Sequence, residues 1–201
     1  MYLPTSYFPS IEYCFQLLKN KKVTLVTKEI FPRQTFRNRC IIVNANGLQN
    51  LSIPVGRESG HATLTSDIQI SYAEDWIKNH LRSIESAYRR TPYYEYYIDA
   101  ITNILEKKHV QLVELNFELL TYLIEKIGLT CSVERSISQT EISKEINEIL
   151  NPKNHASFQT KEYLQTFTER FGFQNNLSCL DLLFNEGPNS ICILEESGYK
   201  I

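Results

Sequence analysis

The 201-residue sequence lacks the features that mark several large classes of protein. No apolar run approaches the roughly 20 residues of a membrane-spanning helix, so no membrane span is expected. The 21 Lys and Arg residues stand against 23 Asp and Glu, and this net charge of −2 argues against a nucleic-acid partner. The sequence does not open with a charged segment followed by an apolar stretch, so no signal peptide is expected and the chain is predicted to be cytoplasmic.

Cysteine and glycine are also sparse, with five Cys and seven Gly. The number of Cys is odd and no two stand at C-x-x-C spacing, which favours reduced thiols over disulfides. The four His residues show no ligand spacing, so no metal site is predicted. The sequence contains no G-x-x-x-x-G-K-[ST], G-x-G-x-x-G or G-x-S-x-G motif, so P-loop kinases, ordinary dinucleotide enzymes and α/β-hydrolases are not supported. No cofactor can be assigned.

The length suits a single domain over residues 1–201, and the pattern predicts an α/β fold with a mixed, partly parallel sheet flanked by helices. Tyr2-Leu3-Pro4 is a short first strand, and a helix is expected from Ile11 to Leu18 with Ser10 as its N-cap. Val23 to Thr27 is the next strand. A strand that returns after a central helical block predicts a crossover, and therefore parallel pairing.

A β-hairpin insertion interrupts this pattern. Arg39 to Asn44 and Leu48 to Val55 have strand character, and Asn46-Gly47 between them favours a tight turn with positive φ. Three amphipathic helices follow, the first with Ser71-x-x-Glu74 at capping-box spacing and the third ended by Gly128. Further elements are predicted as strands at 68–71, 130–134 and 191–194, helices at 141–150, 161–171 and 180–185, and a polar, lid-like loop at 151–160.

The densest polar stretch runs from Arg33 to Arg39 and leads into the hairpin. Arginine side chains match the geometry of carboxylate and phosphate, and Arg37 and Arg39 would share one face of a strand while Asn38 points the other way. These three residues are therefore candidates for binding a small molecule with a carboxylate or a phosphate. The alternative is a solvated strand edge with no ligand.

One histidine and several tyrosines complete the candidate site. His80 lies on the first long helix and is the candidate general base, although a hydrogen-bonded structural histidine is the simpler alternative. Tyr7, Tyr88 and Tyr93 combine an apolar ring with a polar tip, which suits the wall of a ligand pocket as well as ordinary packing. Glu12, Glu29 and Glu85 are the nearby carboxylates, and each is a candidate base or an arginine partner.

Several ordered motifs together resemble those of the WbqC-like family of bacterial proteins. The similar stretches span nearly the whole chain: Tyr7-Phe8-Pro9-Ser10-Ile11-Glu12-Tyr13, Gln34-Thr35-Phe36-Arg37-Asn38-Arg39, Leu51-Ser52-Ile53-Pro54-Val55, Trp76 through His80 to Tyr88, Pro92-Tyr93, and Asn176 through Asp181 to Gly187. The resemblance implies a link to surface-polysaccharide (O-antigen) biosynthesis, and for some members an amino-acid (glycine) transferase activity.

A more distant likeness is to the nucleotidyltransferase-like, Rossmann-like fold of pantothenate synthetase. Many family members carry His-Gln-Pro at the end of the first strand, whereas this chain has Tyr2-Leu3-Pro4, so the histidine of an adenylating enzyme is missing. Two functions therefore stay open. One is a group-transfer enzyme with His80 as base, and the other is a non-catalytic accessory protein that binds a sugar or nucleotide.

Overall fold

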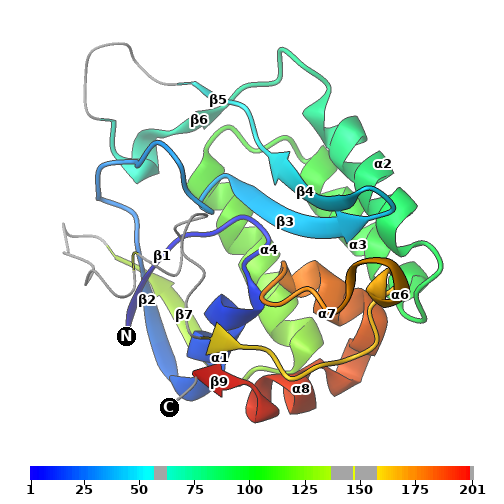
Figure 1. Ribbon diagram of the computed structural model, residues 1–201. Coiled ribbons are helices and arrows are strands. Elements are labelled where there is room, and N and C mark those ends of the chain that lie inside the picture. The colour runs from blue at the N-terminus through cyan, green and yellow to red at the C-terminus, as the bar shows by residue number, and fades with distance from the viewer. Residues whose placement is uncertain (57–62, 137–146, 148–157, 200–201) are drawn as a thin grey trace.

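The computed structural model describes residues 1–56, 63–136, 147 and 158–199, which form a mixed α/β fold (Figure 1). Its parallel sheet has the order β1-β2-β7. The strands are β1 (Tyr2–Pro4), β2 (Lys22–Val26) and β7 (Ser132–Arg135). Leu3 lies opposite Leu25, and Val23 lies opposite Val133. The predicted parallel pairing across a helical crossover is confirmed.

Helix α1 (Ile11–Lys19) connects the first two strands, close to the predicted bounds. Its first turn is closed by Ser10, whose Oγ accepts a hydrogen bond from the Tyr13 backbone N–H at 3.3 Å, as an N-cap should. Apolar residues at helical spacing bury nearly the whole of α1, which packs against two helices near the end of the chain, α7 (Cys179–Glu186) and α8 (Ser190–Glu196).

The predicted hairpin is present as β3 (Arg39–Asn44) and β4 (Gly47–Ser52). The turn falls one residue earlier than expected, because Gly47 opens β4 opposite Asn44 with a φ of 103°. The predicted second strand also ends early. Pro54 lies two residues after Ser52 and cannot donate to a strand ladder. The chain instead continues into β5 (Val55–Gly56), which pairs with β6 (Gln69–Ile70) after the short 3₁₀ helix η1 (Thr65–Asp67).

The three central helices are confirmed as α2 (Trp76–Tyr88), α3 (Tyr94–Glu106) and α4 (Leu112–Ile127). Gly128 ends α4 in the left-handed conformation, with a φ of 81°. The predicted capping box was wrong. Helix α2 begins after Asp75, whose carboxylate accepts a hydrogen bond from the Lys78 N–H at 3.4 Å, so Ser71 lies well before the helix. Aspartate caps a helix as well as serine does, and the capping-box spacing alone could not decide between Ser71 and Asp75 as the N-cap.

The last third of the chain corrects two predictions. The helix expected at 161–171 is only α6 (Thr168–Phe171), because hydrogen bonds from Tyr163 and Gln165 to distant residues hold the preceding segment in a non-helical conformation. The strand expected at 191–194 lies inside α8, after the 3₁₀ helix η2 (Gly187–Asn189). The helix at 180–185 is confirmed as α7. Strands β8 (Phe158–Gln159) and β9 (Gly198–Tyr199) form a short antiparallel pair.

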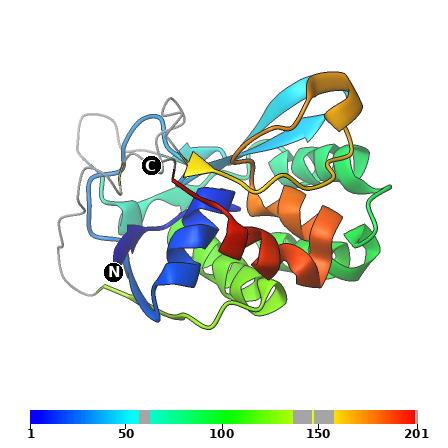
Figure 2. The same ribbon diagram turned by 60° about the horizontal axis from the view of Figure 1, so that its bottom comes forward.

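Most of the helix predicted at 141–150 and most of the loop at 151–160 lie outside the described residues. Within the described part of the chain, one apolar core joins the parallel sheet, α1, the hairpin and the central helices. Figure 2 shows the hairpin to one side of the helices, and in both views α6 lies beside the hairpin turn (Figures 1 and 2). No helix of the described segments is long and apolar enough to cross a membrane.

Candidate functional site

The loop that follows β1 brings Tyr7 against His80. Parallel strands commonly carry ligand sites beyond their carboxyl ends, and residues 5–10 leave β1 at that edge of the sheet. The hydroxyl of Tyr7 lies 3.0 Å from Nδ1 of His80, which projects from the inner face of α2. The ring of Trp76, one turn earlier, packs edge-on against the imidazole at 5.1 Å between centroids. Two of the residues predicted for the site are thus in direct contact.

Burial fixes the protonation of this pair. It lowers the pKa of His80 to about 4, against which a hydrogen bond to the Ser52 backbone acts weakly, so the imidazole is neutral near pH 7. Burial also raises the pKa of Tyr7, which therefore keeps its proton. A hydrogen bond from the imidazole to the Ser52 backbone favours the tautomer in which Nδ1 accepts the Tyr7 hydrogen.

Arg37 is buried in the loop between β2 and β3, where its charge is matched by Glu29. Its Nε donates to Glu29 Oε1 at 2.7 Å, Nη1 donates to Thr35 Oγ1 at 2.8 Å, and Nη2 donates to Asn147 Oδ1 at 3.1 Å. The Arg37 carbonyl in turn accepts a hydrogen bond from Asn116 on α4 at 2.7 Å. This guanidinium holds together segments that follow β2 and β7, and most of its donors are already used.

Asn38 and Arg39 keep polar atoms without a partner. Asn38 Nδ2 donates to the Ile53 carbonyl at 3.0 Å, but its Oδ1 has no hydrogen bond among the described residues. Nε of Arg39 and Nε1 of Trp76 are among the other buried atoms in the same condition, which also include the hydroxyls of Thr65 and Tyr88. Buried polar atoms are nearly always paired, so those of Asn38, Arg39 and Trp76 are available to a ligand or to water.

The structure places the other three predicted residues apart from His80. Glu12 accepts hydrogen bonds from Asn176 and from Tyr199, each at 2.9 Å, and ties α1 to the last third of the chain. Burial raises the pKa of Glu12, against these two hydrogen bonds. The Tyr93 ring packs directly over Gly187, where a Cβ would stand 2.5 Å from the ring.

Tyr88 belongs instead to a buried polar cluster around Asp181, which sequence reasoning missed. The Tyr163 hydroxyl donates to Asp181 Oδ1 at 2.6 Å, and the described residues contain no cation paired with this carboxylate. Burial raises the pKa of Asp181 to about 6. The sequence does contain a sign of this buried carboxylate. Asp181 stands within the apolar run from Leu180 to Phe184 of a helix, and such a run normally faces the core.

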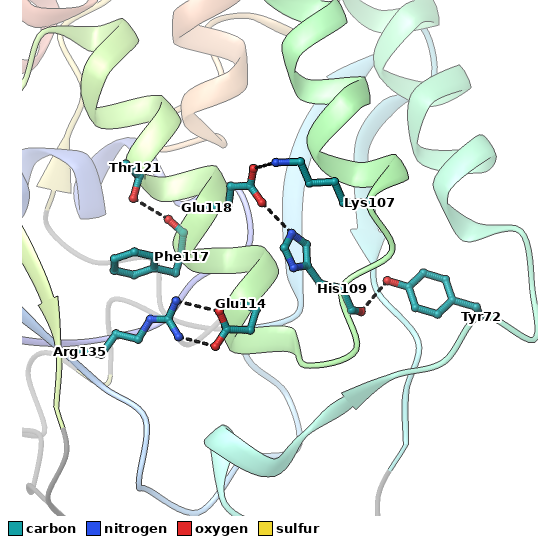
Figure 3. A network of polar contacts seen from close by, with 8 residues as sticks. All are labelled: Tyr72, Lys107, His109, Glu114, Phe117, Glu118, Thr121 and Arg135. Atoms are coloured by element: carbon teal, nitrogen blue, oxygen red, sulfur yellow. Dashed lines mark hydrogen bonds and ion pairs between the residues drawn. The ribbon is translucent and has the colours of Figure 1, made fainter.

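A second polar network joins α4 to β7 and to the loop before α4 (Figure 3). Arg135 donates through both terminal nitrogens to Glu114, and its guanidinium lies 4.2 Å from the centre of the Phe117 ring. Glu118 accepts from Lys107 and lies 2.7 Å from His109 Nε2. The charged groups are paired with one another and partly exposed, which is the arrangement of a structural brace rather than of a site awaiting a ligand.

Two surface grooves lie on α2, and none of the eight predicted site residues lines either. The larger, about 900 Å³, runs between α2 and α3. Within the described segments, no group of three or more His, Cys, Asp or Glu side chains could hold a metal ion. All five cysteines are free thiols.

A model of the WbqC-like protein family matches residues 5–156. The chain belongs to the WbqC-like protein family. The match covers the Tyr7–His80 contact and the Arg37 loop, whereas Asp181 and Tyr163 lie beyond it. No curated protein and no solved structure matches this WbqC-like chain.

Proposed function

We propose that this WbqC-like protein is a cytoplasmic group-transfer enzyme of bacterial surface-polysaccharide biosynthesis, which moves an amino-acid group such as glycine onto a sugar. The observation that carries the proposal is the buried pair in which neutral His80 accepts a hydrogen bond from Tyr7 at 3.0 Å. A histidine that is neutral at pH 7 can take up a proton when a hydroxyl or amine attacks.

The proposed chemistry uses both members of the pair. As the acceptor hydroxyl or amine of the sugar forms its bond to the transferred group, its proton passes to the Tyr7 oxygen, and Tyr7 passes its own proton to Nδ1 of His80. When the bond between the transferred group and its leaving group breaks, Tyr7 gives a proton to the leaving group and His80 returns its proton to Tyr7. No net charge builds up on Tyr7, which suits a buried hydroxyl whose pKa is raised.

The carboxylate or phosphate of the substrate needs donors nearby. Arg37 is engaged by Glu29, so in this proposal it shapes the loop, while the partner-free Nε of Arg39 and Nε1 of Trp76 contact the anion. The side-chain oxygen of Asn38, also without a partner among the described residues, accepts from a substrate hydroxyl or amine. A polar substrate that pairs these atoms removes the cost of leaving them buried and unpaired.

The second candidate is a non-catalytic protein that binds a sugar or nucleotide. The observation in its favour is the enclosure of His80, whose side chain contacts Tyr7, Trp76 and the Ser52 backbone and lies outside the two grooves on α2. In that case the Tyr7–His80 contact only fixes the loop after β1 to α2.

The test begins with a thermal-shift screen of nucleotides, nucleotide sugars and amino acids, since a ligand that binds only the folded state raises the midpoint. Turnover is then measured with the ligands found. Tyr7→Phe and His80→Asn should lower kcat by roughly 10²–10⁴-fold while changing ligand affinity little. The matched control is Tyr72→Phe, which removes a hydroxyl bonded at 2.8 Å to the His109 carbonyl from a ring that also stacks on Trp76.

The outcomes separate the two candidates. Loss of turnover in Tyr7→Phe and His80→Asn, with Tyr72→Phe near the parent, supports the enzyme. Ligand binding without turnover in any protein supports the accessory role. Equal turnover in all four proteins would refute the proposed role of the pair.

A further inference from the structure

The smaller groove on α2 has a composition that suits an anion. It encloses about 510 Å³ between the C-terminal half of α2, the turn of the hairpin and the segment that leads into α6. We call it the arginine pocket, and its lining residues are Ala45, Arg82, Glu85, Ser86, Ala87, Arg89, Arg90, Thr166 and Phe167. None of them is among the eight residues predicted for the site, although Glu85 is a candidate base or arginine partner from the sequence.

Positive charge is in excess inside the arginine pocket. Three arginines, Arg82, Arg89 and Arg90, face one carboxylate, Glu85, although the whole chain has a net charge of −2. Arg89 pairs with Glu85 at 3.4 Å, whereas Arg82 and Arg90 form no ion pair or hydrogen bond with the described residues. Two guanidinium groups are therefore left with donors directed at solvent.

The helix dipole explains only part of this charge. Arg89 and Arg90 follow the last turn of α2, where a cation interacts favourably with the exposed carbonyl groups. Arg82 lies near the middle of the helix, beyond the reach of that effect. A further reason is needed for a third arginine in the same concavity.

Tertiary hydrogen bonds hold the wall opposite α2 in place. Tyr163 is anchored to Asp181 at 2.6 Å, and Gln165 exchanges hydrogen bonds of 3.0 Å and 2.8 Å with the backbone of Gln174. On the hairpin side, the Arg170 guanidinium donates to the carbonyl of Ala45. Figure 1 shows α6 next to the hairpin. The pocket is thus pre-formed, which lowers the entropic cost of binding.

Part of the lining of the pocket is apolar. Ala45, Ala87 and the half-buried ring of Phe167 contribute to it, and Ser86 and Thr166 add hydroxyl groups. An inorganic anion bound to the arginines would leave these apolar side chains exposed to solvent. A ligand that joins a multiply charged anion to a planar or apolar body would cover them.

We propose that the arginine pocket binds a phosphate-bearing small molecule, with the phosphates on Arg82 and Arg90 and the organic part against Phe167. Phosphate fits better than a carboxylate, because its greater charge and three or more oxygens can engage two guanidinium forks together. The site is distinct from the proposed catalytic pair, since His80 is buried on the inner face of α2 and Arg82 is exposed on the outer face.

Isothermal titration with uridine diphosphate and with inorganic pyrophosphate tests the proposal. Arg82→Glu should weaken binding of both probes by about tenfold or more, as loss of a charge-assisted contact and reversal of its charge require. Arg90→Gln, which only removes a charge, should weaken binding less. The matched control is Lys19→Glu at the exposed end of α1, which changes the net charge by the same amount as Arg82→Glu but lies outside the pocket.

The organic part has its own test. Phe167→Ala should reduce the affinity for uridine diphosphate several-fold and leave that for pyrophosphate nearly unchanged, because only the former has a ring to stack. The proposal would be overturned if neither uridine diphosphate nor pyrophosphate bound. It would also be overturned if Lys19→Glu lowered the affinity for the probes as much as Arg82→Glu does. His80→Asn should leave both affinities unchanged, so the arginine pocket and the proposed enzyme function stand or fall separately.

Discussion

Two buried ionisable side chains, His80 and Asp181, are expected to change the free energy of unfolding in opposite directions as the pH falls from about 6.5 to about 4. Burial shifts both pKa values, but it lowers that of His80 to about 4 and raises that of Asp181 to about 6. The ordinary values are 6.5 and 3.8. The two groups titrate over nearly the same pH range.

The sign for His80 follows from which state binds the proton first. Above pH 6.5 the imidazole is neutral in both states, and its contribution to stability is fully present. As the pH falls below 6.5 the unfolded chain is protonated while the folded protein resists, so stability is lost down to about pH 4. The gap between the two pKa values corresponds to about 3 kcal/mol.

The sign for Asp181 is the reverse. Below pH 3.8 the carboxyl is protonated in both states, and its contribution is fully present. As the pH rises, the unfolded chain gives up its proton first, and the folded protein is forced to bury a charge as the pH passes about 6. The lost stability is again about 3 kcal/mol. In the parent protein the two contributions largely cancel.

Urea unfolding at pH values from 4 to 7.5 measures this cancellation in the parent, His80→Asn and Asp181→Asn. Asparagine keeps a hydrogen-bonding group at each position and cannot titrate. The stability of His80→Asn should rise relative to the parent as the pH is lowered, and that of Asp181→Asn should fall. Glu12, whose pKa is also raised, is present in all three proteins and drops out of the differences.

The comparison rests on slopes, so a constant loss of packing in either variant does not disturb it. If the free energy of unfolding depended on pH in the same way in all three proteins, folding would change the pKa of neither group. The assignment of a neutral, buried His80 would then be wrong. If only one variant differed from the parent in its pH dependence, the expected pKa shift would be wrong for the residue replaced in the other variant.

Three further predictions concern single contacts. Arg37→Ala should lower the free energy of unfolding by about 3–5 kcal/mol, because it leaves the Glu29 carboxylate without its partner, and chemical denaturation measures this. Gly187→Ala should cost about 2 kcal/mol or more, because its φ is 53° and the new Cβ meets the Tyr93 ring, and Tyr93→Ala in the same chain should restore part of the loss in melting temperature. In a thiol-reagent assay, the exposed Cys192 should react rapidly in the native protein, and a loss of two hydrogens in its mass would contradict the free thiols.

The regular elements could be predicted because their signals are local. Helix α4 repeats Leu at helical spacing and is capped by Gly128, and the hairpin carries Asn-Gly just after the β-branched strand β3. The conformation of the segment before α6 could not be predicted in this way. Tyr163 and Gln165 are kept out of a helix by hydrogen bonds to partners that lie 18 and 9 residues further along the chain. Propensity favoured a helix there, and tertiary hydrogen bonds decided otherwise.

The same distinction applies to the candidate site. The side chains of Tyr7 and His80 were identified by type, and the structure brings them together across 73 residues. The partner of Arg37 could not be chosen from the sequence, which offered several carboxylates in the first hundred residues, and only the loop after β2 selects Glu29. Whether an arginine binds a ligand or a neighbour depends on such distances, which no spacing rule contains.

The loop that bears Tyr7 depends on residues that are synthesised long after it, since Phe8 and Ser178 lie 170 residues apart in the sequence. Phe8 stands at a φ of 38°, an unfavourable conformation for an aromatic residue, and its carbonyl accepts from Ser178 Oγ at 3.0 Å. Two backbone hydrogen bonds hold the residues that follow Phe8. The Cys179 N–H donates to the Pro9 carbonyl, and the Ile11 N–H donates to the Leu177 carbonyl. On the ribosome, this loop therefore cannot settle until the segment around Ser178 has emerged, and a nascent chain interrupted before that point has the Tyr7 side chain but not the conformation that presents it to His80.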